Sequence, residues 1–247
     1  MSSDELTRII VAERDELAAA GYEYRELGES GRAEELERRV QIVETYLPDR
    51  CPSLPSVSTT PLGAILTGGR STRMGRDKAD VEIEDETMLS LVSRALSPCV
   101  GRTVLLGPDR EGWESWPDAV HAQGPLAGIA TALARATSDR VILLAVDQPF
   151  VRTATLQELI GVESGLPVVP VDETGTRQVT CAIYPTTIAS TAAEEAGAGG
   201  SIQTLLDTVS FTPVAPDEWR SWGEDGRSWF SVDTEDDLAK GLSRFGN

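Results

Sequence analysis

The sequence predicts an α/β fold in which helices cover both faces of a mostly parallel sheet, preceded by an α-helical hairpin. From residue 62 onwards, short apolar runs alternate with amphipathic stretches of helical periodicity. The apolar runs are continuous, which is typical of parallel strands buried on both faces. A proline-free stretch rich in Glu, Arg, Leu and Ala before residue 48 indicates the hairpin.

The first part of the chain divides into a hairpin and a linker. In residues 1–50, apolar residues recur at helical spacing on both sides of a glycine-containing turn at 28–31. Prolines then cluster, and they predict a linker over residues 51–61. The hairpin carries no motif with recognisable chemistry, so we expect it to serve packing or homo-oligomerisation. The remaining residues, 62–247, form the domain that contains the sheet.

Strands and helices are expected to alternate along this domain. The expected strands are 63–67, 103–106, 141–146, 167–171 and 180–184. The expected helices lie near 87–97, 126–137, 153–161, 186–196 and 201–207, with a short one after Asp233. Open α/β sheets bind their ligands at the carboxyl ends of the strands, so the residues that follow these strands are the candidates for ligand binding.

Charge and composition exclude several classes of partner. The chain has 40 acidic and 22 basic residues, a net charge of −18, so nucleic acid and acidic membrane surfaces would be repelled. Three widely spaced cysteines fit a reducing compartment, and the acidic start of the chain does not resemble a signal peptide. The longest strongly apolar run, 141–146, is too short to cross a bilayer. We therefore expect a cytoplasmic protein.

The segment 68–78, Gly-Gly-Arg-Ser-Thr-Arg-Met-Gly-Arg-Asp-Lys, directly follows the first expected strand. Paired glycines let a backbone approach a ligand closely and present N–H groups to phosphate oxygens. Four cations lie within nine residues of an otherwise acidic chain: Arg70, Arg73, Arg76 and Lys78. The pattern is neither a Walker loop nor a dinucleotide-binding Gly-x-Gly-x-x-Gly motif. It predicts another kind of polyphosphate-binding loop.

Three further segments could contribute to the same site. Asp147 ends the most apolar strand, where a carboxylate could hold Mg²⁺ against a phosphate. Gly124 and Pro125 could open a helix and present its N–H groups to a base or a phosphate. Asp233 precedes the C-terminal helix, and either it or Thr234 could cap that helix. Asp233 could alternatively bind the metal.

Taken in order, these four segments resemble the MobA-like nucleotidyltransferases, the family of the molybdenum cofactor guanylyltransferases. The resemblance covers about residues 62–242. It implies a Rossmann-like three-layer sandwich of the nucleotide-diphospho-sugar-transferase type. It also implies Mg²⁺-dependent transfer of GMP from GTP to molybdopterin, with release of pyrophosphate. The pair Gly68-Gly69 and the run Gly124-Pro125-Leu126 look more like guanylyltransferases than cytidylyltransferases.

The resemblance implies roles for individual residues. Arg73, Lys78 and Asp147 would be catalytic. Asp147 and Asp233 would bind the metal, and Ser231 and Asp233 would bind the acceptor. The residues implied to bind the nucleotide are Leu66, Thr67, Gly68, Gly69, Arg73, Lys78, Gly124 and Asp147.

The chain departs from the family pattern at two places that bear on the substrates. Ser231 stands where the bacterial motif has an asparagine, and residues 119–123 lack an acid that many members use for guanine. Two alternatives therefore stay open. One is a related transferase with a CTP donor or another phosphorylated acceptor, such as a sugar phosphate or a cobamide precursor. The other is a catalytically silent module that binds a nucleotide or a partner.

Overall fold

The computed structural model describes residues 60–67, 77–117 and 124–246, all of which belong to one compact unit, Ser58–Asn247. The expected hairpin at 1–50 lies outside the described residues, as does most of the expected linker. Among the predicted site residues, Gly68, Gly69 and Arg73 also lie outside them.

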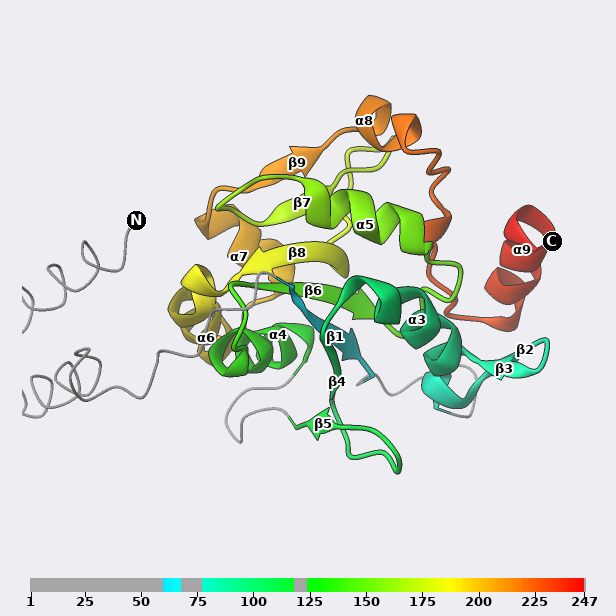
Figure 1. Cartoon of the computed structure of the whole chain (residues 1–247), viewed down its shortest axis with the longest axis horizontal. Coiled ribbons are helices and arrows are strands. Elements are labelled where there is room, and N and C mark those ends of the chain that lie inside the picture. The colour runs from blue at the N-terminus through cyan, green and yellow to red at the C-terminus, as the bar shows by residue number, and fades with distance from the viewer. Residues whose placement is uncertain (1–59, 68–76, 118–123, 247) are drawn as a thin grey trace, which may run out of the picture. The chain divides into compact units, whose positions relative to one another are not determined.

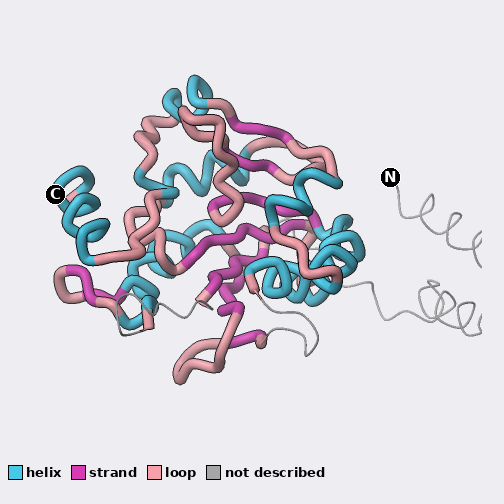
Figure 2. The backbone as a smooth tube through the Cα atoms, turned by 180° about the vertical axis from the view of Figure 1, so that it is seen from behind, coloured by secondary structure: helices cyan, strands magenta, loops and turns pink. Residues whose placement is uncertain are grey.

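A seven-stranded sheet forms the centre of this unit (Figures 1 and 2). The strand β1 (Leu62–Leu66) lies between two parallel neighbours, β4 (Arg102–Leu106) and β6 (Arg140–Ala145). The other strands are β5 (Ser115–Trp116), β7 (Val168–Pro170), β8 (Cys181–Pro185) and β9 (Thr212–Val214). The strand order is β5-β4-β1-β6-β8-β7-β9, so three parallel strands end together at one edge beside β1.

The expected strands are confirmed to within one residue at each end. The short strands β5 and β9 were not expected, because two or three residues give no readable period and β9 contains Pro213. Strand β8 pairs antiparallel with both β6 and β7, which makes the sheet mostly parallel. A continuous apolar run indicates burial on both faces but not the direction of the neighbouring strand.

Helices cover both faces of the sheet, and Figure 2 shows the strands running between them. One face carries α4 (Pro125–Arg135), α6 (Ala189–Gly197) and α7 (Ile202–Thr208). The other face carries α3 (Met88–Leu96), α5 (Thr153–Gly161) and α8 (Pro216–Ser221). Successive strand residues explain the two cores: Leu105 packs with α3 and α5, while Leu106 packs with α4. The three-layer α/β sandwich is therefore confirmed.

Single turns of 3-10 helix connect several of these elements. They are η1 (Lys78–Asp80), η2 (Ser97–Cys99), η3 (Thr186–Ile188) and η4 (Arg227–Trp229). A small hairpin, β2 (Glu82–Ile83) and β3 (Glu86–Thr87), and the C-terminal helix α9 (Glu235–Phe245) lie at one end of the unit (Figure 1). They share a third apolar cluster built around Val81, Met88 and Val232. Through this cluster, α9 packs near the segment that follows η1.

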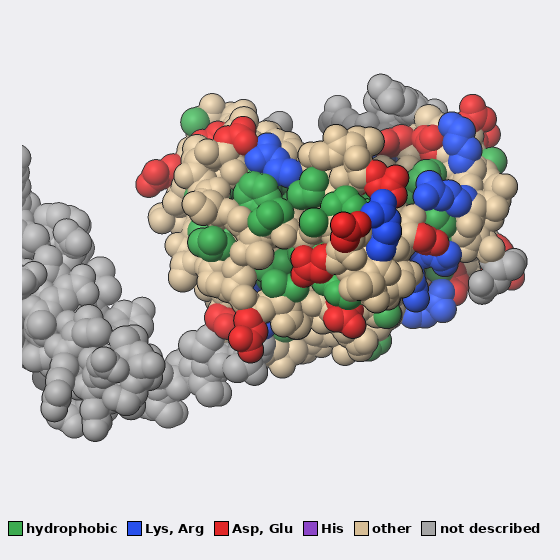
Figure 3. All heavy atoms as spheres, turned by 90° about the horizontal axis from the view of Figure 1, so that it is seen from above, with side chains coloured by type: hydrophobic (Ala, Val, Ile, Leu, Met, Phe, Trp, Pro, Cys, Tyr) green, Lys and Arg blue, Asp and Glu red, His purple; other side chains and the backbone are tan. Residues whose placement is uncertain are grey.

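The surface of the described unit carries charges of both signs. Figure 3 shows one face, on which acidic and basic side chains are interspersed with apolar ones. None of the helices within 60–67, 77–117 and 124–246 is both long enough and apolar enough to cross a membrane.

Candidate active site

The carboxyl ends of β1 and β6 supply the floor of the site. Thr67 follows β1 directly; its N–H donates to the Leu106 carbonyl at 3.0 Å and its hydroxyl donates to the same oxygen at 3.3 Å. The Val146 N–H donates to the Leu66 carbonyl at 3.0 Å, which extends the pairing of β1 and β6 past the strand ends. The chain then turns, and Asp147 lies in this turn, two residues after the end of β6. The backbone thus places Leu66, Thr67 and Asp147 at one edge of the sheet.

Lys78 reaches this edge from the turn η1. Its ammonium Nζ donates to Asp147 Oδ2 at 2.8 Å and to Asp233 Oδ1 at 2.5 Å. The lysine side chain is only 14% exposed, whereas Asp233 is 52% exposed. Burial lowers the pKa of Lys78, but the hydrogen bonds and charges of the two aspartates outweigh burial and hold this pKa above its ordinary value. The ammonium therefore stays charged at neutral pH.

The segment 230–233 brings Asp233 to Lys78. The Val232 N–H donates to the Asp147 carbonyl at 2.8 Å, so the two acidic segments are joined by their backbones. Phe150 and Phe230 also meet, with ring centroids 6.1 Å apart in an edge-on arrangement. Each phenylalanine is three residues from one of the aspartates. Aromatic packing and one backbone hydrogen bond therefore fix the spacing of the two carboxylates.

Thr234, rather than Asp233, caps α9. Its side-chain oxygen accepts from the Asp237 N–H at 3.1 Å, the standard capping contact. The Asp233 carboxylate is therefore available to Lys78, and the Ser231 hydroxyl donates to its other oxygen at 3.4 Å. Thr234 therefore caps α9, and the neighbouring Asp233 forms the ion pair with Lys78.

A cavity of about 260 Å³ opens beside these groups. Five of the predicted site residues line it: Leu66, Thr67, Lys78, Asp147 and Ser231. Asp233 does not line it but pairs with Lys78. Gly124 caps α4 with φ of 99°, a conformation that favours glycine, and Pro125, the first residue of α4, lines the cavity. The expected opening of this helix by Gly-Pro is confirmed.

Sequence reasoning missed part of the cavity wall, formed by Gln148, Gln178 and Thr180. Gln148 is buried; its Nε2 donates to Thr180 Oγ1 at 3.1 Å, and its Oε1 accepts from the Ala145 N–H at 3.3 Å. Gln148 could have been predicted as a site residue, because it directly follows Asp147 in the sequence. Gln178 and Thr180 come to the site because β8 returns antiparallel beside β6, which no local pattern indicates.

Two carboxylates that converge on one cation are suited to a hard metal ion. Asp147 and Asp233 both place an oxygen within hydrogen-bonding distance of a single ammonium. In the described part of the chain, no cluster of three or more His, Cys, Asp or Glu residues could hold a metal. Magnesium is commonly bound by one or two carboxylates together with substrate phosphates, and Asp147 and Asp233 could supply two such carboxylates. Burial raises the pKa of both Cys99 and Cys181, so neither described thiol is an activated nucleophile.

The fold and this site define the class of the protein: the chain belongs to the family of the MobA-like NTP transferase domain, whose model matches residues 63–211. The match includes β1, β4 and β6 together with Lys78 and Asp147. The expected family is therefore confirmed.

Part of the chain is also similar to named proteins of this family. The chain is 39% identical over 89 residues to a probable molybdenum cofactor guanylyltransferase of Deinococcus radiodurans, covering 35% of this chain and 46% of the relative. It is 36% identical over 102 residues to the protein of that name in a Nostoc species, covering 38% and 49%. The matched part of the chain thus spans about half the length of these relatives.

Solved structures show the same fold. The molybdopterin-guanine dinucleotide biosynthesis protein A of Archaeoglobus fulgidus aligns with a TM-score of 0.65 at 23% identity, over 74% of this chain and 97% of that one. The 2-C-methyl-D-erythritol 4-phosphate cytidylyltransferase of Thermus thermophilus aligns with a TM-score of 0.54 at 13% identity, over 74% and 98%. Both solved structures therefore share the architecture of this chain.

Proposed function

We propose that this chain transfers GMP from GTP to a phosphorylated acceptor, molybdopterin, and releases pyrophosphate. The observation that carries this proposal is the convergence of Asp147 and Asp233 on Lys78, beside a cavity at the carboxyl edge of the sheet that Lys78 and Asp147 line. Family membership and the names of the relatives support GTP as the donor and molybdopterin as the acceptor.

In this reaction an oxygen of the acceptor phosphate attacks the α-phosphorus of GTP. The bond from the α-phosphorus to the bridging oxygen breaks, and negative charge accumulates on the departing pyrophosphate. The Lys78 ammonium, together with Arg73, would neutralise that charge, which is the main requirement of phosphoryl-type transfers. No side chain need act as a nucleophile, because the attacking group belongs to the acceptor.

Asp147 and Asp233 would hold Mg²⁺, and their convergence on one ammonium supports this assignment. When bound, the metal would neutralise charge at the reacting phosphate. Leu66, Thr67, Gly68, Gly69 and Gly124 would contact the nucleotide along the edge of β1 and the start of α4. Ser231 and Asp233 would face the acceptor.

The test is a matrix of nucleotides and acceptors, with pyrophosphate release as the measurement. GTP, CTP and ATP are each incubated with Mg²⁺ and with molybdopterin, a sugar phosphate or a cobamide precursor. We expect release with GTP and molybdopterin, and none after Asp147→Asn. Release with another nucleotide and acceptor would mean that the chain is a nucleotidyltransferase with substrates other than GTP and molybdopterin. If nucleotides bind but no pair releases pyrophosphate, the chain is a binding module and the proposal is wrong.

We also propose a cytoplasmic location and a self-associating role for residues 1–50. The catalytic motifs all begin after residue 58, where the compact unit begins. A chain that starts at Ser58 should keep nucleotidyl transfer, with an altered oligomeric state by light scattering or a reduced thermal stability. A folded chain of this kind without activity would contradict the assignment.

A further inference from the structure

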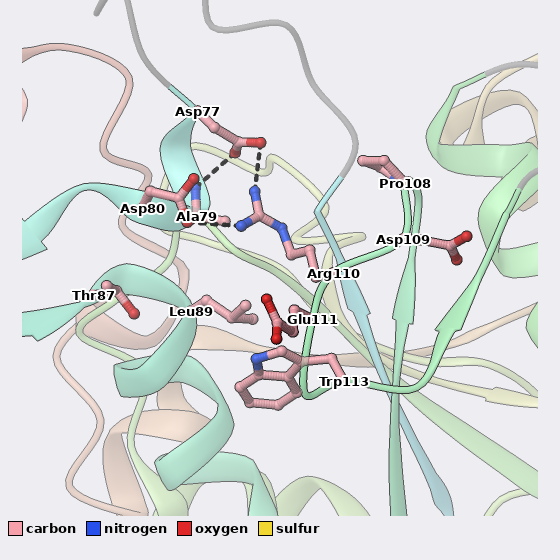
Figure 4. Close-up of a pocket in the computed structure, with 10 residues that line it drawn as sticks. All are labelled: Asp77, Ala79, Asp80, Thr87, Leu89, Pro108, Asp109, Arg110, Glu111 and Trp113. Atoms are coloured by element: carbon pink, nitrogen blue, oxygen red, sulfur yellow. Dashed lines mark hydrogen bonds and ion pairs between the residues drawn. The ribbon is translucent and has the colours of Figure 1, made fainter.

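Arg110 binds both ends of the turn that carries Lys78 (Figure 4). It lies in the loop between β4 and β5, and its Nη1 is 2.7 Å from Asp80 Oδ1. Its Nη2 pairs with Asp77 Oδ2, and Asp77 Oδ1 accepts from the Ala79 N–H at 3.0 Å. One guanidinium therefore joins the residue before Lys78 to the end of η1.

The turn η1 needs support from outside itself. It is three residues long, and a 3-10 turn of this length has little stability of its own. Its internal backbone bonds run from Asp80 N to Asp77 O and from Val81 N to Lys78 O, each 3.1 Å. The Arg110 side chain, only 16% exposed, adds a bidentate contact across this turn.

The loop that carries Arg110 is itself braced. The Arg110 N–H donates to Ser115 Oγ at 3.3 Å, and the Arg110 carbonyl accepts from the Trp113 N–H at 3.1 Å. The loop forms one wall of an open cavity of about 560 Å³, with η1 and the start of α3 opposite (Figure 4). The guanidinium is thus presented from a folded loop.

Charge gives the contact a second consequence. Asp77 and Asp80 flank Lys78 in the sequence, in a chain of net charge −18. Without Arg110, these two carboxylates would be unpaired and would add negative potential at the turn that carries Lys78. Arg110 pairs with both of them, while Lys78 pairs with Asp147 and Asp233.

We propose that Arg110 is a positioning residue for phosphate binding by Lys78: it holds η1 in place and neutralises Asp77 and Asp80. This inference rests on the proposed function, because it assumes that Lys78 meets the phosphates of the nucleotide. Arginine is suited to the task, since lysine cannot bridge two carboxylates in the same planar geometry.

The experiment measures the affinity for inorganic pyrophosphate and the steady-state kinetics for Arg110→Met, Arg110→Lys and Asp80→Asn. We expect Arg110→Met to weaken pyrophosphate binding and raise the KM for nucleotide by roughly tenfold, with Arg110→Lys intermediate. The matched control is Arg102→Met, which removes an exposed arginine paired with Glu114 at the base of the same loop and should change neither quantity.

A double-mutant cycle separates positioning from a general structural role. If Arg110 acts through Lys78, Arg110→Met should cost little further affinity in a Lys78→Met background, whereas independent losses would multiply. Multiplying losses, or an unchanged KM for Arg110→Met, would overturn the inference. If Arg110→Met does not fold, the same double-mutant cycle with Lys78→Met is measured with Arg110→Lys and with Asp80→Asn.

The two proposals fail in distinguishable ways. If the wild-type chain releases no pyrophosphate in the assay, and Arg110→Met weakens pyrophosphate binding, the inference is retained and the proposed function is wrong. Normal turnover in wild type and in Arg110→Met alike would remove the inference alone. A wild-type chain that binds no pyrophosphate would overturn both.

Discussion

Lys78 and Asp147 are far apart in the sequence, yet Lys78 Nζ lies 2.8 Å from Asp147 Oδ2. Asp233 binds the same ammonium, so one cation holds two carboxylates together at the edge of the sheet. Without a cation between them, these acids would repel each other in a chain that is already strongly acidic. The lysine therefore organises the site before any ligand arrives.

Lys78→Met should reduce kcat/KM for the nucleotide by roughly 10- to 150-fold, because a charge-assisted contact is worth about 1.5–3 kcal/mol. The measurement is pyrophosphate release at several nucleotide concentrations. Lys240→Met is the matched control, since Lys240 is exposed in α9. Equal rates for the two variants would contradict the assignment of Lys78 to the phosphates.

Asp147→Asn should abolish Mg²⁺-dependent turnover while leaving the fold intact, because an amide does not supply the anionic oxygen that a hard cation prefers. Asp233→Asn should require more Mg²⁺ for the same rate, since this carboxylate is half exposed. Asp236→Asn, an exposed position in the first turn of α9, serves as the control. Titration of activity with Mg²⁺ decides between these outcomes, and a normal Asp147→Asn curve would place the metal elsewhere.

Glu224→Ala should lower stability more than Glu224→Gln. This buried carboxylate accepts from the hydroxyls of Thr155 and Ser228 at 2.5 Å each, and from the N–H groups of Asp225 and Gly226. Alanine leaves buried donors without an acceptor, at about 1–3 kcal/mol each. Glutamine can still accept from the N–H groups and donate to the hydroxyls. Urea unfolding of both variants tests the order, and equal losses would contradict it.

Gly241→Ala should destabilise the chain by about 1–3 kcal/mol, because a Cβ at this position would lie 2.3 Å from Phe150 Cε2. Helix propensity alone would favour alanine by about 1 kcal/mol, so the sign of the change is informative. Gly197→Ala, at the end of α6 with open space around it, is the control and should be neutral or stabilising. Thermal unfolding measures both. A stabilised Gly241→Ala would mean that α9 can move without cost.

Asp225→Asn should lose stability at neutral pH but not at low pH. The hydrogen bond from Arg227 holds the pKa of Asp225 below its ordinary value of 3.8. A lowered carboxyl pKa contributes stability above the unfolded value, and this contribution is lost as the pH falls below 3.8. The pair is half exposed, so the effect is about 0.5 kcal/mol or less. Melting curves of both chains between about pH 6 and pH 2.5 should converge.

The local sequence predicted the longer strands and helices, and it singled out Lys78 and Asp147, which the structure brings together. Apolar runs marked β1, β4 and β6, because the inner positions of strands buried on both faces are apolar. Asp147 was predictable because it follows β6 at the edge where α/β sheets bind ligands, and Lys78 because it ends the glycine- and arginine-rich segment 68–78. The choice between Asp233 and Thr234 as the cap was left open by the sequence, since both residue types cap helices.

Tertiary structure decided how these pieces meet. The antiparallel direction of β8 brings Gln178 and Thr180 to the cavity, and burial alone does not encode strand direction. The contact of Phe150 with Phe230 sets Asp233 beside Lys78, and Arg110 reaches Asp77 and Asp80 from another loop. Each of these contacts joins segments distant in sequence, and such contacts depend on packing and charge in three dimensions rather than on any local period.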